Sequence, residues 1–168
     1  MHSQFEQVAL PHLDAAYNLA YWLTGDSQDA EDVVQEAYLR AFKFFDSYHG
    51  GNSHAWLLSI VRNTTYTWMR QNRMNMGAEL LEDELPDTNL VSLESSYLQK
   101  ADFQRLREAI AALPVEYREV IVLHDLEGLA YKEIASVANI PLGTVMSRLS
   151  RARDRLQKSL IDHQEREV

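Results

Sequence analysis

The chain contains no cysteine, and this absence excludes disulfide bonds, thiolate zinc sites and cysteine nucleophiles. It also lacks any apolar run close to the roughly 20 residues that a helix needs to cross a bilayer. The N-terminal segment MHSQFEQVALPHLD lacks a basic stretch followed by an apolar one, which is the pattern of a secretion signal. We therefore expect a soluble, cytoplasmic protein with no membrane insertion.

Patterns typical of enzymes are also missing from the sequence. The six histidines are scattered, and although His49 and His54 share a predicted loop, no carboxylate pair completes a metal site. No glycine-rich phosphate-binding loop and no Ser/His/Asp arrangement is present. We therefore expect no catalytic residue, no metal and no cofactor, and an enzyme is the first alternative that the sequence disfavours.

Positive charge is scarce overall, because 25 acidic residues face 16 basic ones and the net charge is -9. Long-range repulsion then opposes indiscriminate binding to DNA or to an anionic membrane. The stretch from Glu79 to Glu94 holds six acids, no base and a Pro-Asp turn signal, which predicts a linker. No sustained apolar/polar alternation predicts strands. The predicted fold is all-α, with two small helical domains (1–73 and 99–168) joined flexibly by an acidic linker (74–98).

Three helices are predicted in the first domain from apolar residues at helical spacing. One ends at Gly25, a second begins near Ser27 with a cap from Ser27 or Asp26, and a third runs from about His54 to Arg73. In the first helix the expected buried residues are Leu13, Tyr17, Ala20 and Leu23. In the second they are Ala30, Val33, Val34, Ala37, Tyr38, Ala41 and Phe45. In the third they are Leu57, Ile60, Val61, Thr64 and Trp68.

The second domain shows the pattern of a helix-turn-helix motif, after helices around Phe103–Leu113 and from Pro114 toward Gly128. A short helix over 131–138 is followed by Asn139, a residue that tolerates positive φ at a turn, and Pro141 begins the next helix. Small Ala135 permits close helix approach. Ile134, Ile140 and Val145 are expected to fill the wedge between the two helices.

The segment PLGTVMSRLSRARDRLQK concentrates four arginines and one lysine against one aspartate. In a helix-turn-helix motif the second helix enters the major groove, where arginine side chains bind guanine edges. The residues expected to face the bases are Thr144, Ser147, Arg148 and Arg151. The residues expected to bind phosphates, which orient the protein without specifying sequence, are Arg153, Arg155 and Lys158. A solvated basic amphipathic helix is the alternative, and the residues of the turn favour the motif.

Two further helix faces of the first domain are candidate binding surfaces. On the second helix an acidic face with one large apolar residue comprises Asp32, Glu36, Leu39 and Lys43; it suits a protein-binding patch, although the residues alone favour a solvated face. On the third helix, Ser59, Arg62, Asn63, Tyr66, Arg70 and Arg73 lie opposite the predicted buried stripe, with Trp56 at the edge. Arginines interleaved with an aromatic suit single-stranded DNA, and Asn63 lies close to the Tyr48–His54 loop, where it could hold a base turned out of the duplex. A plain basic surface is equally consistent with this spacing.

The segments DAEDVVQEAYLRAF, WLLSIVRNTTYTWMRQNR and LPVEYREVIVLHDLEGLAYKEIASVANIPLGTVMSRLSRARDRL resemble bacterial RNA polymerase sigma factors of the extracytoplasmic-function (ECF) group. The resemblance covers nearly everything from about residue 10 to 160 except the linker. It implies a factor that binds core RNA polymerase and directs promoter-specific transcription initiation, with an anti-sigma factor as a regulatory partner.

The resemblance also implies roles by position. The residues matching the face that docks on the clamp helices of the largest polymerase subunit are Asp29, Asp32, Gln35, Glu36, Leu39 and Arg40. Those matching the minus-ten element reader are Tyr48, His54, Trp56, Ser59, Arg62, Asn63, Tyr66, Arg70 and Arg73. The helix-turn-helix motif matches the minus-35 reader, in the domain expected at the polymerase flap.

Some positions depart from the family pattern and leave the promoter sequence open. Many relatives have an aspartate where this chain has Thr67, a basic residue in place of Met146, and an aromatic residue near His54. A stand-alone, dimeric helix-turn-helix regulator is the second alternative. It accounts for the second domain but leaves both partner faces of the first domain unused.

Overall fold

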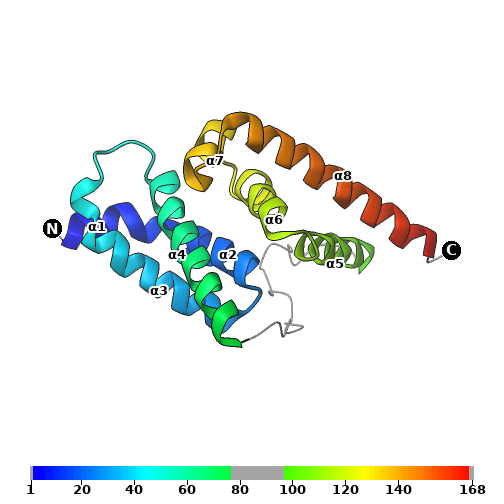
Figure 1. The fold of residues 1–168 in the computed structure, drawn as a ribbon, viewed down its shortest axis with the longest axis horizontal. Helices are drawn as coiled ribbons and strands as arrows, with labels where there is room; N and C mark the ends of the chain where they lie inside the picture. Colours follow the sequence, from blue (N-terminus) through cyan, green and yellow to red (C-terminus); the bar gives the residue numbers. More distant parts are fainter. Residues whose placement is uncertain (1, 77–96, 167–168) are drawn as a thin grey trace.

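The computed structural model describes residues 2–76 and 97–166, and these residues form helices without any strand (Figure 1). The N-terminal half, residues 2–76, contains α1 (His2–Ala9), η1 (Leu10–His12), α2 (Leu13–Thr24), α3 (Ser27–Lys43), η2 (Phe45–Ser47) and α4 (Ser53–Met76). The C-terminal half, residues 97–166, contains α5 (Tyr97–Ala111), α6 (Val115–Ile121), η3 (Val122–Leu126), α7 (Tyr131–Ala138) and α8 (Leu142–Arg166). The predicted acidic linker falls between α4 and α5, and residues 77–96 lie outside the described part of the chain.

Local signals in the sequence determine the helix ends of the N-terminal half. Gly25 ends α2 in the left-handed conformation, with φ of 79°, which glycine adopts without a steric penalty. The Asp26 carboxylate then accepts a hydrogen bond from the Asp29 backbone N–H at 2.9 Å and caps α3. Both helix boundaries are confirmed. The predicted buried stripe of α3 is confirmed at Ala30, Val33, Val34, Ala37 and Ala41, whereas Tyr38 and Phe45 are only half-buried.

The helices α2, α3 and α4 pack on one another, and α1 lies against them. The ring of Phe5 on α1 contacts Phe42 and Phe45 edge-on, at centroid distances of 5.2 and 5.5 Å. The Tyr38 hydroxyl donates to the Ala9 carbonyl at 2.7 Å. This first helix is not predicted from the sequence, and Leu13, expected to be buried, is instead 44% exposed.

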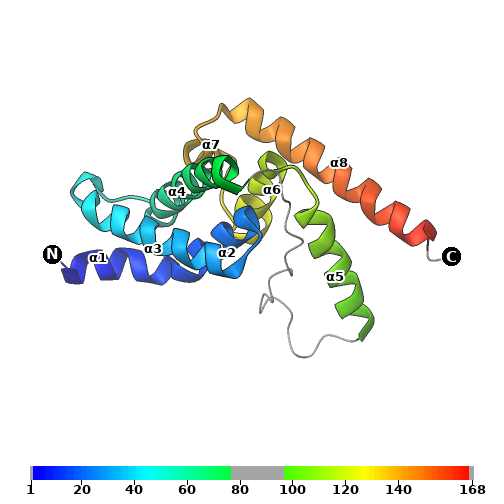
Figure 2. The same ribbon diagram turned by 60° about the horizontal axis from the view of Figure 1, so that its bottom comes forward.

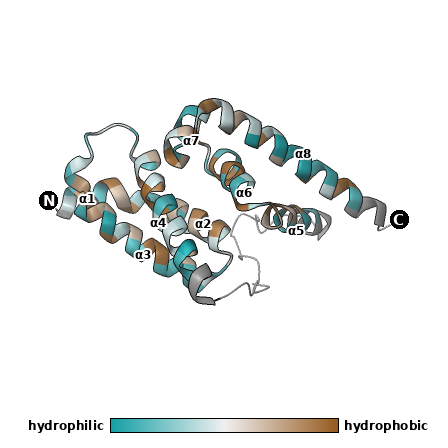
Figure 3. Ribbon diagram, viewed as in Figure 1, coloured by the Kyte–Doolittle hydropathy of each residue, from teal (hydrophilic) through white to brown (hydrophobic). Residues whose placement is uncertain are grey.

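The C-terminal half contains the predicted helix-turn-helix motif. Helix α7 spans Tyr131–Ala138 as expected, and Asn139 adopts φ of 55°, the one positive φ among the described non-glycine residues. Ile134 and Val145 are fully buried between α7 and α8. Helix α8 is hydrophilic over most of its length, with one apolar stripe facing the core (Figure 3).

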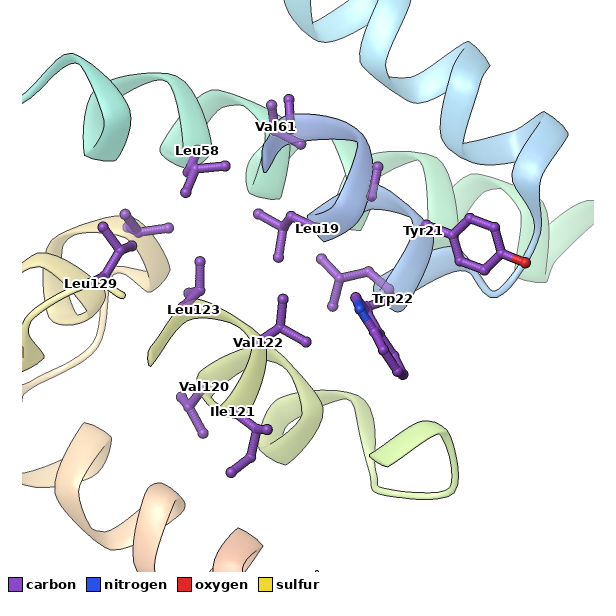
Figure 4. Packing of buried hydrophobic residues seen from close by; sticks show 14 of the residues in the cluster. Leu19, Tyr21, Trp22, Leu58, Val61, Val120, Ile121, Val122, Leu123 and Leu129 are labelled. Carbon is purple, nitrogen blue, oxygen red and sulfur yellow. The ribbon is translucent and has the colours of Figure 1, made fainter. Parts of the chain in front are cut away.

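The two halves share one hydrophobic core rather than standing apart as separately tethered modules (Figure 2). Helix α7 packs on α4, and α6 with η3 packs on α2. Figure 4 shows Leu19 and Trp22 of α2 and Leu58 of α4 facing Val122, Leu123 and Leu129 of the C-terminal half. This contact changes the expected burial of α4.

The predicted buried stripe of α4 is confirmed at three positions and is wrong at two. Leu57, Val61 and Thr64 are buried, whereas Ile60 and Trp68 are only half-buried. The fully buried Leu58 was not expected in the stripe. It is buried because the C-terminal half covers a second side of the helix, and a single amphipathic stripe in the sequence does not reveal this second contact.

Candidate nucleic-acid and partner interfaces

The first candidate surface is the outer face of α8. Val145, Leu149 and Ala152 point into the core, so side chains at intervening positions are directed outward. Ser147 and Arg151 are exposed, and Thr144 and Arg148 are half-buried beside them. Within the described ranges neither Arg148 nor Arg151 forms an ion pair with an acidic residue. The four predicted base-facing residues therefore lie on one accessible surface.

The three predicted phosphate-binding residues on α8 already have partners in their own half of the chain. Arg153 lies 3.2 Å from the Asp125 carboxylate, and a hydrogen bond with Tyr131 raises the pKa of Arg153. Arg155 stacks 4.9 Å above the Tyr117 ring. Lys158 pairs with Asp154 one turn earlier at 3.1 Å. Exposed pairs of this kind are weak, so a phosphate can replace them.

The acidic face of α3 is the second candidate surface. Asp32, Gln35 and Glu36 are exposed, and Leu39 is 67% exposed among them. Arg40 donates to Glu36 at 2.8 Å and makes a long hydrogen bond to Thr64 at 3.5 Å, which fixes it at the edge of the face. Asp29 is half-buried in the first turn of α3, one turn before this face.

Sequence reasoning missed an apolar extension of this surface. Phe44, which follows α3, is 54% exposed, and the Lys43 ammonium lies 5.8 Å from the centre of its ring. Phe42 is 39% exposed although one edge contacts Phe5. The signal was present as apolar residues three and five positions after Leu39, at the end of an otherwise charged helix.

The loop between α3 and α4 carries an aromatic cluster. The rings of Tyr48 and Trp56 lie 4.9 Å apart, and Phe45 packs against both. The Tyr48 hydroxyl donates to the Gly51 carbonyl at 3.0 Å, across a turn in which Gly50 and Gly51 both have positive φ. Two of the predicted minus-ten residues, Tyr48 and Trp56, are thereby brought together beside the start of α4.

His54 does not join this aromatic cluster. Its ring stacks on His12 at 5.1 Å, and its Nε2 lies 3.6 Å from the Glu127 carboxylate of the C-terminal half. Burial and the neighbouring His12 lower the pKa of His54. Burial also raises the pKa of Glu127. His54 therefore faces the other half of the chain.

The predicted basic and aromatic face of α4 is divided by the C-terminal half. Asn63 and Arg70 are exposed and Ser59 is half-buried, while the Arg73 side chain lies outside the described residues. Arg62 and Tyr66, expected on the open surface, are instead covered. The Arg62 Nε donates to Glu119 Oε1 at 2.6 Å, and the Tyr66 hydroxyl donates to Glu119 Oε2 at 2.7 Å. Helical periodicity could place these two residues opposite the apolar stripe but could not reveal what lies over them.

Glu119 is fully buried, and removing its charge from water costs free energy. Its hydrogen bonds to Arg62 and Tyr66 offset this cost. The Arg62 guanidinium also lies 3.9 Å over the Tyr66 ring, which aligns both donors toward the carboxylate. Burial, reinforced by the charge of Glu119, raises the pKa of Tyr66. Burial lowers the pKa of Arg62, but its hydrogen bond and attraction to Glu119 outweigh this and raise the pKa overall.

The described residues contain neither a metal-binding cluster nor a membrane-spanning helix. Over residues 2–76 and 97–166, no group of three or more acidic or histidine side chains is arranged to hold a metal ion. Among the helices of the same residues, none combines the length and the apolar character needed to cross a membrane.

Comparisons with known proteins identify a family for both halves of the chain. Residues 9–74 match the family described as Sigma-70 region 2, and residues 103–156 match Sigma-70, region 4. The chain is 32% identical to the ECF RNA polymerase sigma factor SigW of Bacillus subtilis, covering 94% of this chain and 89% of SigW. It is 37% identical to the ECF sigma factor SigE of Mycolicibacterium smegmatis, over 95% of this chain but only 62% of that longer relative.

A solved structure is similar over both halves of the chain. It is the sigma factor RpoE of Bartonella quintana in complex with the anti-sigma factor NepR, with a TM-score of 0.79 and 31% identity, covering 94% of this chain and 96% of RpoE. The chain therefore contains both sigma regions in order, and its similarity to named sigma factors extends over both. The chain belongs to the ECF sigma factors of bacterial RNA polymerase, which direct promoter-specific transcription initiation.

Proposed function

We propose that the two halves of this sigma factor divide promoter recognition between them. Residues 1–73 dock on core RNA polymerase and read and open the minus-ten element, residues 74–98 link the domains, and residues 99–168 read the minus-35 element. The observation that carries this proposal is the helix-turn-helix motif, in which Asn139 turns the chain and leaves Ser147 and Arg151 exposed on α8.

The minus-35 assignment rests on the chemistry of the outer face of α8. Arginine binds guanine through two parallel hydrogen bonds, and hydroxyl groups contact bases or phosphates. Arg151 and Arg148 supply the first kind of contact, while Ser147 and Thr144 supply the second. Arg153, Arg155 and Lys158 flank this face and exchange weak internal partners for phosphates.

The polymerase-docking assignment rests on Leu39. A large apolar side chain that is 67% exposed within a rim of carboxylates is the arrangement of an anchor at a protein interface. Asp32 and Glu36 give this surface a negative potential that suits a basic partner, and Phe44 extends its apolar part. Asp29, Gln35 and Arg40 complete its border.

The minus-ten assignment involves two groups of residues, one accessible and one in contact with the C-terminal half. Asn63 and Arg70 are exposed on α4, and Tyr48 and Trp56 lie together at its start; we assign to them the stacking and holding of single-stranded bases. Arg62 and Tyr66 belong to the same helix face but are engaged by Glu119, so they serve DNA only when the two halves separate. His54 is in the same position, because it faces Glu127.

An anti-sigma factor is the regulatory partner that we assign to the chain. RpoE of Bartonella quintana, which is similar over both halves, is solved in complex with one. Such a protein would cover the polymerase-docking or DNA-binding faces. The place of action is the cytoplasm, where the polymerase and the promoter are present.

Run-off transcription with purified core polymerase tests the proposal. Core enzyme plus this chain should produce transcripts from promoters of its own regulon and none from a housekeeping promoter, while core enzyme alone produces neither. Sequence-specific binding to an operator without polymerase, combined with no promoter-specific transcript, would favour the stand-alone regulator and contradict the proposal.

A further inference from the structure

The contact between α4 and α6 has an unusual centre for an interface between two domains. Glu119 is fully buried and its carboxylate has one oxygen on Arg62 and the other on Tyr66, residues 57 and 53 positions earlier in the chain. A carboxylate buried in this way is tolerated only while its partners stay in place. The two donors that hold it lie on the face assigned to the minus-ten element.

Other polar contacts also join the two halves. Arg118 donates to the Trp22 carbonyl at 2.7 Å and to the Leu113 carbonyl at 3.0 Å, so it bridges the interface. Glu133 accepts a hydrogen bond from the Ala130 backbone N–H at 2.8 Å and another from the Asn52 side chain. Each contact is made between side chains or backbone groups of this chain itself.

The chemistry of the Glu119 contact resembles that of a DNA contact. A guanidinium stacked on an aromatic ring, with a hydroxyl beside it, presents donors to an anionic oxygen, and phosphate oxygens bind the same donors as carboxylate oxygens. The Nε–H of Arg62 and the single hydroxyl proton of Tyr66 are both donated to Glu119, so neither of these donors can bind a nucleic acid while the contact is closed.

We propose that the C-terminal domain competes with promoter DNA within the same chain. Its Glu119 occupies Arg62 and Tyr66 until the two domains separate. The inference rests on the minus-ten role given to α4 under the proposed function, and it adds the group that regulates this face. In the closed chain, the Glu119 carboxylate takes the place of a nucleic-acid oxygen. Opening exposes Arg62 and Tyr66 at the same step that releases the C-terminal domain to reach its own element.

The variant Glu119→Gln tests the closing role of the carboxylate, because it keeps the shape of the side chain and removes its charge. In the closed state of this variant Arg62 lacks a charged partner. In the open state water solvates Arg62 and the new glutamine, so the substitution destabilises only the closed state. The ratio of closed to open chains should fall by at least about tenfold. Glu116→Gln is the matched control, since it removes the same charge from an exposed position on the same helix.

The absence of cysteine from the chain gives a direct measure of opening. Val122→Cys places a single thiol at the interface, facing the N-terminal half (Figure 4). Val145→Cys places one in the wedge between α7 and α8, inside the C-terminal half. The rate at which each thiol reacts with a disulfide reagent reports the fraction of time for which it is open to solvent.

With Glu119→Gln, the Val122→Cys thiol should react at least about tenfold faster while the Val145→Cys thiol keeps its rate. With Glu116→Gln, neither rate should change. Equal rates at Val122→Cys in wild type and Glu119→Gln would overturn the proposal, and so would equal acceleration of both thiols, which indicates general unfolding. If Glu119→Gln loses its helical circular dichroism, Tyr66→Phe replaces it and should give the same selectivity with a smaller acceleration. This experiment contains neither DNA nor polymerase, so its outcome does not depend on the proposed function.

A second measurement tests the competition with DNA, using a fluorescein-labelled single strand of random sequence at low salt. Apparent affinity scales with the open fraction, so Glu119→Gln should bind this strand several-fold more tightly than Glu116→Gln. Adding Arg62→Ala should remove the gain. An opened chain with no gain would overturn the competition, and run-off transcription by the wild type, measured separately, shows whether the minus-ten assignment fails with it.

Discussion

The outer faces of α8 and α4 carry the same signal in the sequence, arginines at helical spacing opposite an apolar stripe, yet they are found in different states. On α8 the predicted base-facing residues Ser147 and Arg151 are exposed. On α4 the predicted DNA-facing residues Arg62 and Tyr66 are bound to the buried Glu119. Similar sequence patterns therefore give one surface that is exposed and one that is partly covered by the other half of the chain.

The difference shows how an acidic protein can carry basic nucleic-acid surfaces. With a net charge of -9, the isolated chain is repelled by DNA at long range. Arg62 and Tyr66 of the α4 face are additionally covered, so the free chain presents only part of this face beside α8. We propose that both faces become fully usable only when a partner holds the two domains apart. The following predictions test this contrast, from the largest expected effect to the smallest.

The shared core should dominate stability. Leu123 is fully buried where the two halves meet, so Leu123→Ala should lower the free energy of unfolding by about 2–5 kcal/mol. Leu39→Ala is the matched control, because Leu39 is 67% exposed and should cost less than about 0.5 kcal/mol. Urea unfolding followed by circular dichroism measures both. A similar small loss in both variants would mean that the two halves do not share a core in solution.

The α3 face should matter for polymerase and not for folding. Asp32→Ala combined with Leu39→Ala should weaken binding to core polymerase by about 2 kcal/mol or more, because it removes the anchor and part of its rim. The control is Glu31→Ala, an exposed acid on the same helix but off this face. Competition binding with labelled core enzyme gives the affinities. Normal core affinity in the double variant, with normal thermal unfolding, would refute the docking assignment.

The open face of α8 should show which residues specify bases. Arg151→Ala should lose about 1–3 kcal/mol of binding at the native minus-35 element and much less at altered ones, because an arginine bound to a base discriminates. Lys158→Ala should lose a small, equal amount on every sequence and lower the salt dependence. Fluorescence anisotropy with polymerase holoenzyme on a series of promoters measures both. An equal loss on all promoters would reassign Arg151 to phosphate.

The contact between the two halves should make the stability of the fold depend slightly on pH, whereas the exposed face of α8 should not. Burial and His12 lower the pKa of His54 in the folded chain. As pH falls just below 6.5, the imidazole is therefore protonated in the unfolded chain before it is protonated in the folded one. Stability from this group is therefore lost as pH falls through that window. Glu127 acts in a lower window, above its ordinary value of 4.5, with the opposite sign. Thermal unfolding at pH 7.5 and 6.0 should show a larger drop for the wild type than for His54→Asn, and equal drops would contradict the prediction.

The helix-turn-helix motif could be predicted to the residue because its determinants are local. Asn139, Pro141 and the apolar residues Ile134 and Val145 lie within a dozen positions of one another. Positive φ at Asn139 and the burial of Ile134 and Val145 follow from that spacing and are confirmed, whereas Ile140, the third residue expected in the wedge, is only half-buried. The cap of α3 by Asp26 was predictable for the same reason.

The state of α4 could not be predicted, because it depends on partners far away in the sequence. Glu119 lies within a helix whose spacing gives no sign that its carboxylate is buried, and acidic residues are seldom buried at all. Its pairing with Arg62 follows only once α6 is placed against α2 and α4. Helix α1 was missed for a related reason, since Phe5 is recognisable as a core residue only beside Phe42 and Phe45.

The central claim is that the α4 face is covered in the free chain and uncovered on polymerase. Dyes on Gln7→Cys and Ser136→Cys, exposed positions on α1 and α7, report the separation of the two halves by energy transfer in a chain without other thiols. The account predicts one high-transfer population for the free chain and a clear fall in transfer when core polymerase is added in saturating amount. Transfer that is already low in the free chain, or that stays unchanged in a complex shown to be formed, would contradict it.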